Sequence, residues 1–193
     1  SEDISNAAWG NFNTVNLSAT TVREDTATAQ HYISNAAFSC VEGMAYFLSI
    51  DVDCTTNDRD VGILYTSAGF GLQAFVNFNI TTGAIVAQGT NVFLLTITDI
   101  GGGVWRIQFY SVATASSASA QIAVNLRPLG NTTRAASYLG NGTSTLYATR
   151  LLVQPGPYDM GYNQTVASAY YGARLDTDPA TLTPRGLLIE GAR

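Results

Sequence analysis

The sequence predicts an all-β protein, an antiparallel sandwich of two sheets that continues into an extended C-terminal arm. Apolar and polar residues alternate in short runs rich in Val, Ile, Thr, Tyr and Phe, which is typical of strands. Clusters of Gly, Asn, Asp and Ser separate these runs at intervals of about ten residues, as turns do. No segment has a sustained helical period with capping residues at both ends, so long helices are not expected.

Strand-like runs follow one another from the N-terminus to residue 153. They cover residues 14–22, 30–40, 45–54, 60–66, 72–79, 84–87, 92–99, 104–113, 119–126 and 145–153. Turn residues separate them at Glu42-Gly43, Thr55-Thr56-Asn57, Ser67-Ala68-Gly69, Thr82-Gly83, Gly101-Gly102-Gly103 and Gly140-Asn141-Gly142. The large apolar side chains expected in the core are Phe47, Ile63, Phe75, Trp105, Ile107, Phe109 and Ile122.

The alternation typical of strands stops after Val153, and the last strand is ended by Pro155, Gly156 and Pro157. Residues 1–154 are therefore expected to form the sandwich, and residues 155–193 an extended connector or arm. Within the arm, "RLDTDPATLTPRGLLIE" predicts a short strand, a turn at Asp178-Pro179 and a second strand around residues 186–190. The apolar run Leu187-Leu188-Ile189 is too small for a core, so we expect it to dock on another subunit or on another protein of the same assembly.

Composition and charge exclude several classes of partner. Only 12% of the residues are charged, and the net charge is −5, whereas nucleic-acid binding needs a positive patch. No run reaches the roughly 18 apolar residues of a membrane span, and the N-terminus lacks a basic segment followed by an apolar run. The surface rich in Thr, Ser, Asn and Gly is typical of an extracellular or virion protein.

Catalytic and metal-binding motifs are scarce, and the chain is predicted not to be an enzyme. His31 is the only histidine and stands in a strand context, which indicates a structural role. Asp51 and Asp53 share one face of a strand, so a glycosidase-like pair stays an alternative, and both are candidate calcium ligands. No other cofactor is expected. Local hairpin pairing keeps Cys40 and Cys54 apart, which predicts two buried thiols rather than a disulfide.

Sugar binding is the ligand chemistry that the composition favours. It needs an aromatic platform for the apolar face of a pyranose, with amide, carboxylate or guanidinium groups for the hydroxyls. The candidate residues around the central loops are Tyr65, Phe70, Gln73, Asn77, Asp58 and Arg59. The alternative is that these aromatic side chains belong to the core or to an interface, and that the Asn-Asp-Arg-Asp stretch at 57–60 is a solvated turn.

The two ends of the chain, "SEDISNAAW" and "RLDTDPATLTPRGLLIEGAR", resemble segments of bacteriophage tail-fibre, head-fibre and spike proteins. Between them, "AQHYISNAAFSCVEGMAYFLSIDV", "AFVNFNITTGAIVAQG", "ITDIGGGVWRIQFYSVAT" and "YLGNGTSTLYATRLLV" are similar to strands of the concanavalin-like or carbohydrate-binding-module-like jelly roll of those proteins. The resemblance covers nearly the whole chain, through short degenerate motifs.

This resemblance implies a jelly-roll module on a virion surface, with other virion proteins as partners and a homo-oligomer, for instance a trimer, as its state. The function it implies is attachment to host surface polysaccharide without catalysis. Two alternatives stay open, a purely architectural capsid-decoration or fibre-joining protein and an accessory domain of a polysaccharide-degrading spike. A glycan binder should expose an aromatic patch flanked by polar groups, whereas an architectural protein should bury that patch against a neighbour.

Overall fold

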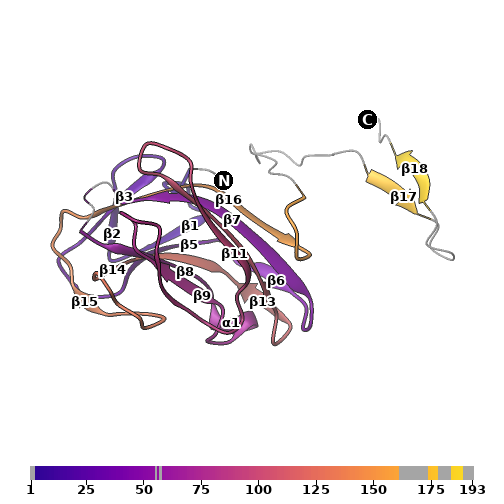
Figure 1. Ribbon diagram of the computed structural model, residues 1–193, viewed down its shortest axis with the longest axis horizontal. Helices are drawn as coiled ribbons and strands as arrows, with labels where there is room; N and C mark the ends of the chain where they lie inside the picture. The colour runs from indigo at the N-terminus through magenta and orange to yellow at the C-terminus, as the bar shows by residue number, and fades with distance from the viewer. Residues whose placement is uncertain (1–2, 55, 57, 161–173, 178–183, 189–193) are drawn as a thin grey trace.

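The computed structural model of the protein describes residues 3–54, 56, 58–160, 174–177 and 184–188. It confirms the all-β prediction, because antiparallel strands make up nearly all of its regular structure. The single helix among these residues, α1 (Ser67–Phe70), lies beside strand β13 (Ser117–Ala120) (Figure 1). None of the described helical structure is long enough to cross a membrane.

Two six-stranded antiparallel sheets form the sandwich. In the first sheet the strand order is β1 (Trp9–Phe12), β5 (His31–Asn35), β14 (Ile122–Arg127), β8 (Asp60–Tyr65), β9 (Phe75–Phe78) and β10 (Ile85–Gln88). In the second sheet it is β11 (Phe93–Asp99), β12 (Trp105–Val112), β7 (Ala45–Asp53), β16 (Thr145–Pro155), β3 (Thr21–Glu24) and β2 (Thr14–Asn16).

Three further strand pairs complete the described structure. Strand β13 pairs with β6 (Phe38–Cys40), and β15 (Tyr138–Leu139) pairs with β4 (Thr28–Ala29). In the C-terminal part, β17 (Arg174–Thr177) and β18 (Pro184–Leu188) pair antiparallel as a separate hairpin. Strand β18 begins two residues before the predicted strand, and the predicted turn at Asp178-Pro179 and Ile189 lie outside the described residues.

The core lies between the two sheets, where alternate residues of each strand point inward. The Tyr65 ring of the first sheet meets the Phe109 ring of the second edge to face, with 5.9 Å between centroids. The Tyr65 hydroxyl donates to the Tyr46 carbonyl oxygen of the second sheet at 2.8 Å, which satisfies its polar atom inside the core. The sheets are therefore joined by packing and by a buried hydrogen bond.

Most of the side chains predicted in the core are buried, but not all of them lie between the sheets. The side chains that lie between the sheets are Ile63, Ile107, Phe109 and Ile122. Phe47 and Phe75 are buried outside the main cluster. Trp105 is half-buried at the edge of the core, and its Nε1 donates to the Ile80 carbonyl oxygen at 2.6 Å.

Three predicted strands are each divided in the structure. Residues 119–126 contain the end of β13 and most of β14, which belong to different sheets. Residues 14–22 contain β2 and the start of β3, which form a hairpin because Leu17 and Ser18 both donate backbone hydrogen bonds to Thr21. Residues 30–40 contain β5 and β6, which belong to different sheets. At the other end, β16 runs to Pro155, which is tolerated because the next bond to β7 is donated by the Gly156 backbone N–H to the Ala45 carbonyl oxygen and not by the proline.

The histidine and the cysteines occupy the structural positions predicted for them. His31 is fully buried, and its Nδ1 lies 2.8 Å from the Asn13 carbonyl oxygen. Cys40 and Cys54 are buried thiols at separate places, Cys40 on β6 and Cys54 directly after β7. These side chains contribute to packing and take no part in the site described below.

Candidate ligand-binding site on the outer face of the first sheet

The outer face of the first sheet carries a row of aligned residues from four strands. The register places Tyr32 of β5 opposite Asn125 of β14, Asn125 opposite Gly62 of β8, and Gly62 opposite Asn77 of β9. Residues in register on neighbouring strands share a face of the sheet. One aromatic ring and two amides are therefore held in line on a rigid strand scaffold.

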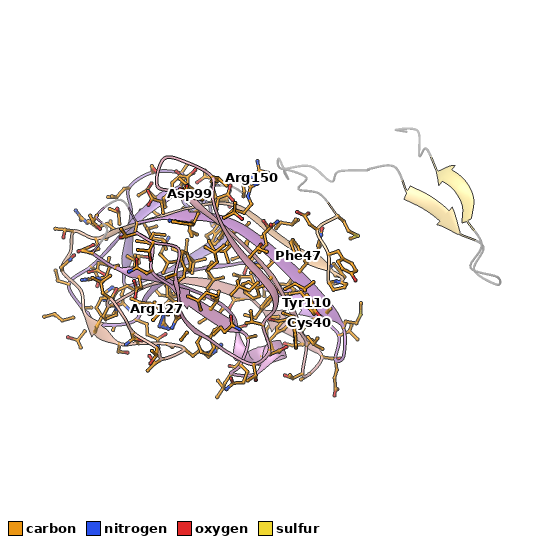
Figure 2. The ribbon with its side chains drawn as sticks, viewed as in Figure 1. Cys40, Phe47, Asp99, Tyr110, Arg127 and Arg150 are labelled. Carbon is orange, nitrogen blue, oxygen red and sulfur yellow. The ribbon has the colours of Figure 1, made fainter. Side chains whose placement is uncertain are left out.

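A buried arginine fixes the loop of residues 128–137 over one end of this row. Arg127 is 1% exposed (Figure 2), and its Nε donates to Asn77 Oδ1 at 3.0 Å while its Nη2 donates to the Thr133 carbonyl oxygen at 2.7 Å. The guanidinium crosses Gly62, where a Cβ atom would lie 2.4 Å from Arg127 Nε. A side chain at residue 62 would collide with Arg127, so this position requires glycine.

The same loop is also held by a buried carboxylate. Asp60 accepts a hydrogen bond from the Gly130 backbone N–H at 2.6 Å and another from Asn79 Nδ2 at 3.0 Å. Asn77 Nδ2 donates to the carbonyl oxygens of Asn131 and Thr133. Asn77, predicted as a sugar ligand, therefore serves to anchor the loop, and its 1% exposure leaves it no surface for a ligand.

Next to this anchored loop lies a pocket of about 160 Å³, here called the Tyr32 pocket. It is lined by Gln30, Tyr32, Leu64, Thr66, Ser67, Ala123, Asn125, Arg134 and Ala135. Amide, hydroxyl, phenol and guanidinium groups face an apolar floor, which is the mixture that a sugar residue requires. Sequence reasoning missed these residues because they come from four separate stretches of the chain.

The Tyr32 ring, which lines the pocket, is held by a second aromatic ring that is not part of the lining. The Phe12 ring stacks on the Tyr32 ring with 4.4 Å between centroids and 8° between planes. Phe12 is 42% exposed, and partial burial raises the pKa of the Tyr32 phenol, so Tyr32 is neutral and can donate a hydrogen bond. Stacked rings of this kind present both an apolar surface and a polar tip to a ligand.

Arg134 is the only charged side chain among the residues that line the pocket. Its Nη2 donates to the Tyr65 carbonyl oxygen at 2.9 Å, while its Nε is buried without a hydrogen-bond acceptor. Burial lowers the pKa of Arg134, which nevertheless stays charged at neutral pH because guanidinium is so strong a base. The pocket therefore holds a fixed positive charge.

Tyr65 and Phe70, predicted as a sugar platform, are instead part of the core. Both are fully buried, and their rings stack on each other with 4.2 Å between centroids. The reason is the direction of β8, whose residue 65 points between the sheets while residue 64 points to the outer face. Gln73 is exposed after α1, and its Oε1 accepts from the Thr90 backbone N–H at 3.4 Å, away from the pocket lining.

Asp58 and Arg59 belong to a second polar cluster, which centres on the fully buried Glu24. The Arg59 guanidinium binds both Glu24 oxygens, at 2.7 and 3.2 Å, and the Tyr138 hydroxyl donates to Glu24 Oε2 at 2.6 Å. The Asn141 backbone N–H donates to Glu24 Oε1 at 2.8 Å. Arg59 is therefore a structural counter-ion of Glu24.

The cluster continues at Asp58, which fixes the turn around Asn141. Asp58 Oδ2 accepts hydrogen bonds from Asn141 Nδ2 at 2.9 Å and from Ser144 Oγ at 2.7 Å. Burial alone would raise the pKa of Asp58, but the hydrogen bond from the Thr56 hydroxyl, these two bonds and the charge of Arg59 hold it below its usual value. Residues 58–60 are thus tied to the sandwich rather than simply solvated, while Asn57 lies outside the described residues.

Asp51, a candidate calcium ligand, is engaged by a guanidinium. Arg106 donates to its two oxygens at 2.7 and 2.9 Å, and Arg150 Nε lies 3.5 Å from Oδ2. Asp53 is half-buried two residues away, and burial raises its pKa. No group of three or more His, Cys, Asp or Glu side chains suited to a metal occurs among the described residues. We therefore propose no calcium at this pair.

A second hollow, here called the edge groove, opens on the side of the sandwich where β1, β5 and β6 face β16. Its volume is about 370 Å³, and it is lined by Ala8, Trp9, Asn35, Ala36, Phe38, Ser39, Tyr46, Leu151, Val153, Gln154 and Pro155. The lining is mainly apolar and carries no charged side chain. The edge groove is larger than the Tyr32 pocket, but its chemistry suits an apolar segment better than a sugar.

Comparison of the sequence with protein-family models and with curated protein sequences finds no match. The geometry of the two hollows is therefore the basis for assigning a function.

Proposed function

We propose that the protein is a non-enzymatic jelly-roll module of a bacteriophage virion surface, which attaches to host cell-surface glycan through the Tyr32 pocket. The observation that carries the glycan part is the Tyr32 ring, held by its stacking on Phe12, which lines the pocket together with amides, hydroxyls and a guanidinium. A pyranose has an apolar face and a rim of hydroxyls, so these groups complement both of its surfaces. The resemblance of the two chain ends to fibre and spike proteins supports the virion part.

Binding without catalysis is favoured by the residues that line the pocket. Thr66 and Ser67 bring hydroxyls, but the lining holds neither a histidine nor a carboxylate to activate one. Glycoside hydrolysis ordinarily needs two carboxyl groups flanking the bond, and the lining offers none. The strands that carry Tyr32 and Asn125 are rigid, which suits recognition of a ligand of fixed shape.

The first test is the Tyr32→Ala substitution, measured by titrating the full chain with fragments of host surface polysaccharide. Loss of the ring should weaken binding about tenfold or more, in line with the loss of one aromatic contact and one hydrogen bond. Incubation of the unaltered protein with the same polysaccharide should release no new reducing ends.

The matched control for this test is Tyr110→Ala, which removes another stacked ring. Tyr110 stacks on Phe93 with 5.1 Å between centroids, on the outer face of the second sheet (Figure 2). This variant should keep full affinity. If Tyr110→Ala abolishes binding and Tyr32→Ala does not, the glycan site lies on the other sheet and the assignment of the Tyr32 pocket is wrong.

The edge groove favours a second candidate function, the joining of copies of this chain. Strand β16 pairs with β7 as far as Pro155, whereas on its other side β3 reaches only residues 145–147. The described strands thus leave one edge of Leu151–Pro155 unpaired, directly along the groove. An edge of this kind accepts an added strand, whose side chains then fill the groove.

We assign this place to the C-terminal arm of a second copy, with Leu187-Leu188-Ile189 as the apolar segment. After β16 the chain turns over the outer face of the second sheet, because Gln154 Nε2 donates to the Tyr158 carbonyl oxygen and Gln108 Nε2 donates to Asp159 Oδ2. The last described residues before the β17–β18 hairpin therefore contact β12 and β16. The β17–β18 hairpin has only two strands and gains stability by docking.

Sedimentation and hydrogen exchange test this assignment. The full chain should associate as its concentration rises, and amides 186–190 should exchange fast in the monomer and slowly in the oligomer. Leu188→Asp should abolish association because it would place a charge in an apolar groove. Leu139→Asp, at a side chain that is 68% exposed, is the control and should leave association unchanged. Strong protection of these amides in a dilute monomer would contradict the assignment.

A further inference from the structure

We infer that the Tyr32 pocket recognises the carboxylate of an acidic sugar residue, with Arg134 as its counter-ion. The inference rests on the proposed glycan-binding function and names the class of glycan. A neutral sugar could use the aromatic wall and the amides alone. A neutral sugar cannot form an ion pair with the guanidinium of Arg134, whereas an acidic sugar can.

The first support is that Arg134 has no anionic partner. None of the ion pairs among the described residues includes it. One hydrogen bond, from Nη2 to the Tyr65 carbonyl oxygen, holds the guanidinium in place, and Nε has no acceptor. Arg134 is half-buried, and a partly desolvated cation without an anionic partner is unfavourable, so a carboxylate that reached this group would gain a charge-assisted interaction.

The second support is the charge around the pocket. The protein as a whole has a net charge of −5, yet no carboxylate lines the Tyr32 pocket. The pKa of Arg127 is lowered to about 10, mainly by burial and in part by the positive charge of Arg134. Asp60, a carboxylate whose charge acts on Arg127, is already engaged by Gly130 and Asn79. The pocket is thus a local positive region on an acidic protein, and it attracts anions.

The size of the pocket narrows the ligand further. Its volume of about 160 Å³ is below the roughly 300–1,000 Å³ of sites that enclose a drug-sized molecule. It therefore suits one terminal or branching residue rather than a stretch of chain. A uronic acid fits this description, because its ring stacks on an aromatic wall while its carboxylate reaches the guanidinium.

The probes for the test are methyl β-D-glucuronide and methyl β-D-glucoside, which differ only in the carboxylate, titrated into the full chain by NMR. The glucuronide should bind about ten- to a hundredfold more tightly, as expected for a hydrogen bond to a charged group. Its affinity should fall as salt is added, whereas that of the glucoside should not.

Two variants test whether Arg134 causes the preference for the charged sugar. Arg134→Gln should remove the preference for the glucuronide and leave the weak binding of the glucoside unchanged. Arg150→Gln removes one positive charge from a side chain that is 44% exposed on the second sheet, and it should keep the preference. If Arg134→Gln does not fold, the salt dependence and the ratio of the two affinities in the unaltered protein decide the question.

The outcomes separate this inference from the proposed function. Equal binding of both sugars that Tyr32→Ala abolishes would overturn the acidic-sugar inference and leave the glycan-binding proposal standing. If neither sugar binds, and the host polysaccharide does not bind either, the proposed function itself fails. A preference for the glucuronide that survives Arg134→Gln would show that another cation recognises the carboxylate.

Discussion

Glu24→Ala is expected to lower the free energy of unfolding by about 3–5 kcal/mol, the range for breaking a buried ion pair from one side. Glu24 is fully buried and accepts hydrogen bonds from Arg59, Tyr138 and Asn141. Its removal leaves the Arg59 guanidinium, only 15% exposed, with the longer ion pair to Asp58 at 3.9 Å in place of its close contact with Glu24. Urea denaturation at pH 7 measures the loss, and a change below about 0.5 kcal/mol, the usual limit for a surface site, would contradict it.

The same cluster predicts how stability depends on pH. Burial alone would raise the pKa of Glu24, but the bonds from Arg59, Asn141 and Tyr138 outweigh it and hold the pKa below its ordinary value of 4.5. Because the folded pKa lies below the unfolded one, the stabilisation is complete above pH 4.5 and is lost as the pH falls through the folded value. The difference in stability between the unaltered protein and Glu24→Gln should therefore shrink in acid.

Glu42→Gln is the control for this pH dependence. Glu42 is exposed at the turn before β7, so its substitution should hardly change the denaturation midpoint at any pH. If the Glu24→Gln difference stays constant between neutral and acidic pH, the carboxylate of Glu24 is not the group whose protonation weakens the fold.

The alternation of the sequence was sufficient to predict the strands that carry the core. Residues 104–113 were expected as a strand with Trp105, Ile107 and Phe109 on one face, and β12 has that face turned toward the core. Residues 60–66 contain β8. In both cases the pattern of period two survives because a strand buries one face against the other sheet.

The same alternation could not tell which face of β8 is inside. All six residues of β8 are buried, because the opposite sheet covers one face and the anchored loop and its neighbours cover part of the other. With both faces buried, the residue types no longer distinguish them, and Tyr65 was placed on the surface. A shift of one residue is enough to exchange the two faces of a strand.

The Tyr32 pocket could not be predicted because it depends on which strands become neighbours. Tyr32, Gly62 and Asn125 meet only because β14 is placed between β5 and β8. The Glu24–Arg59 pair likewise joins residues that are 35 positions apart in the sequence. Contacts of this kind follow from the order and register of the strands, which local residue propensities do not predict.

Phe70→Ala is expected to lower the free energy of unfolding by about 3–5 kcal/mol, the range for removal of a large buried aromatic side chain. Phe70 is fully buried at the end of α1. Its ring stacks on Tyr65 at 4.2 Å and meets Tyr46 edge to face at 5.5 Å, so truncation leaves a cavity among rings of both sheets. Thermal and urea denaturation measure the effect.

Leu72→Ala is the matched control, since Leu72 lies two residues further along the chain and is 63% exposed. It should change the stability by less than about 0.5 kcal/mol. Under conditions where Phe70→Ala stays folded, both variants should bind the acidic sugar as the unaltered protein does, because neither residue lines the Tyr32 pocket. A Phe70→Ala variant that kept its stability and lost sugar binding would indicate that Phe70 is a surface platform for the sugar. The site would then not lie on the outer face of the first sheet.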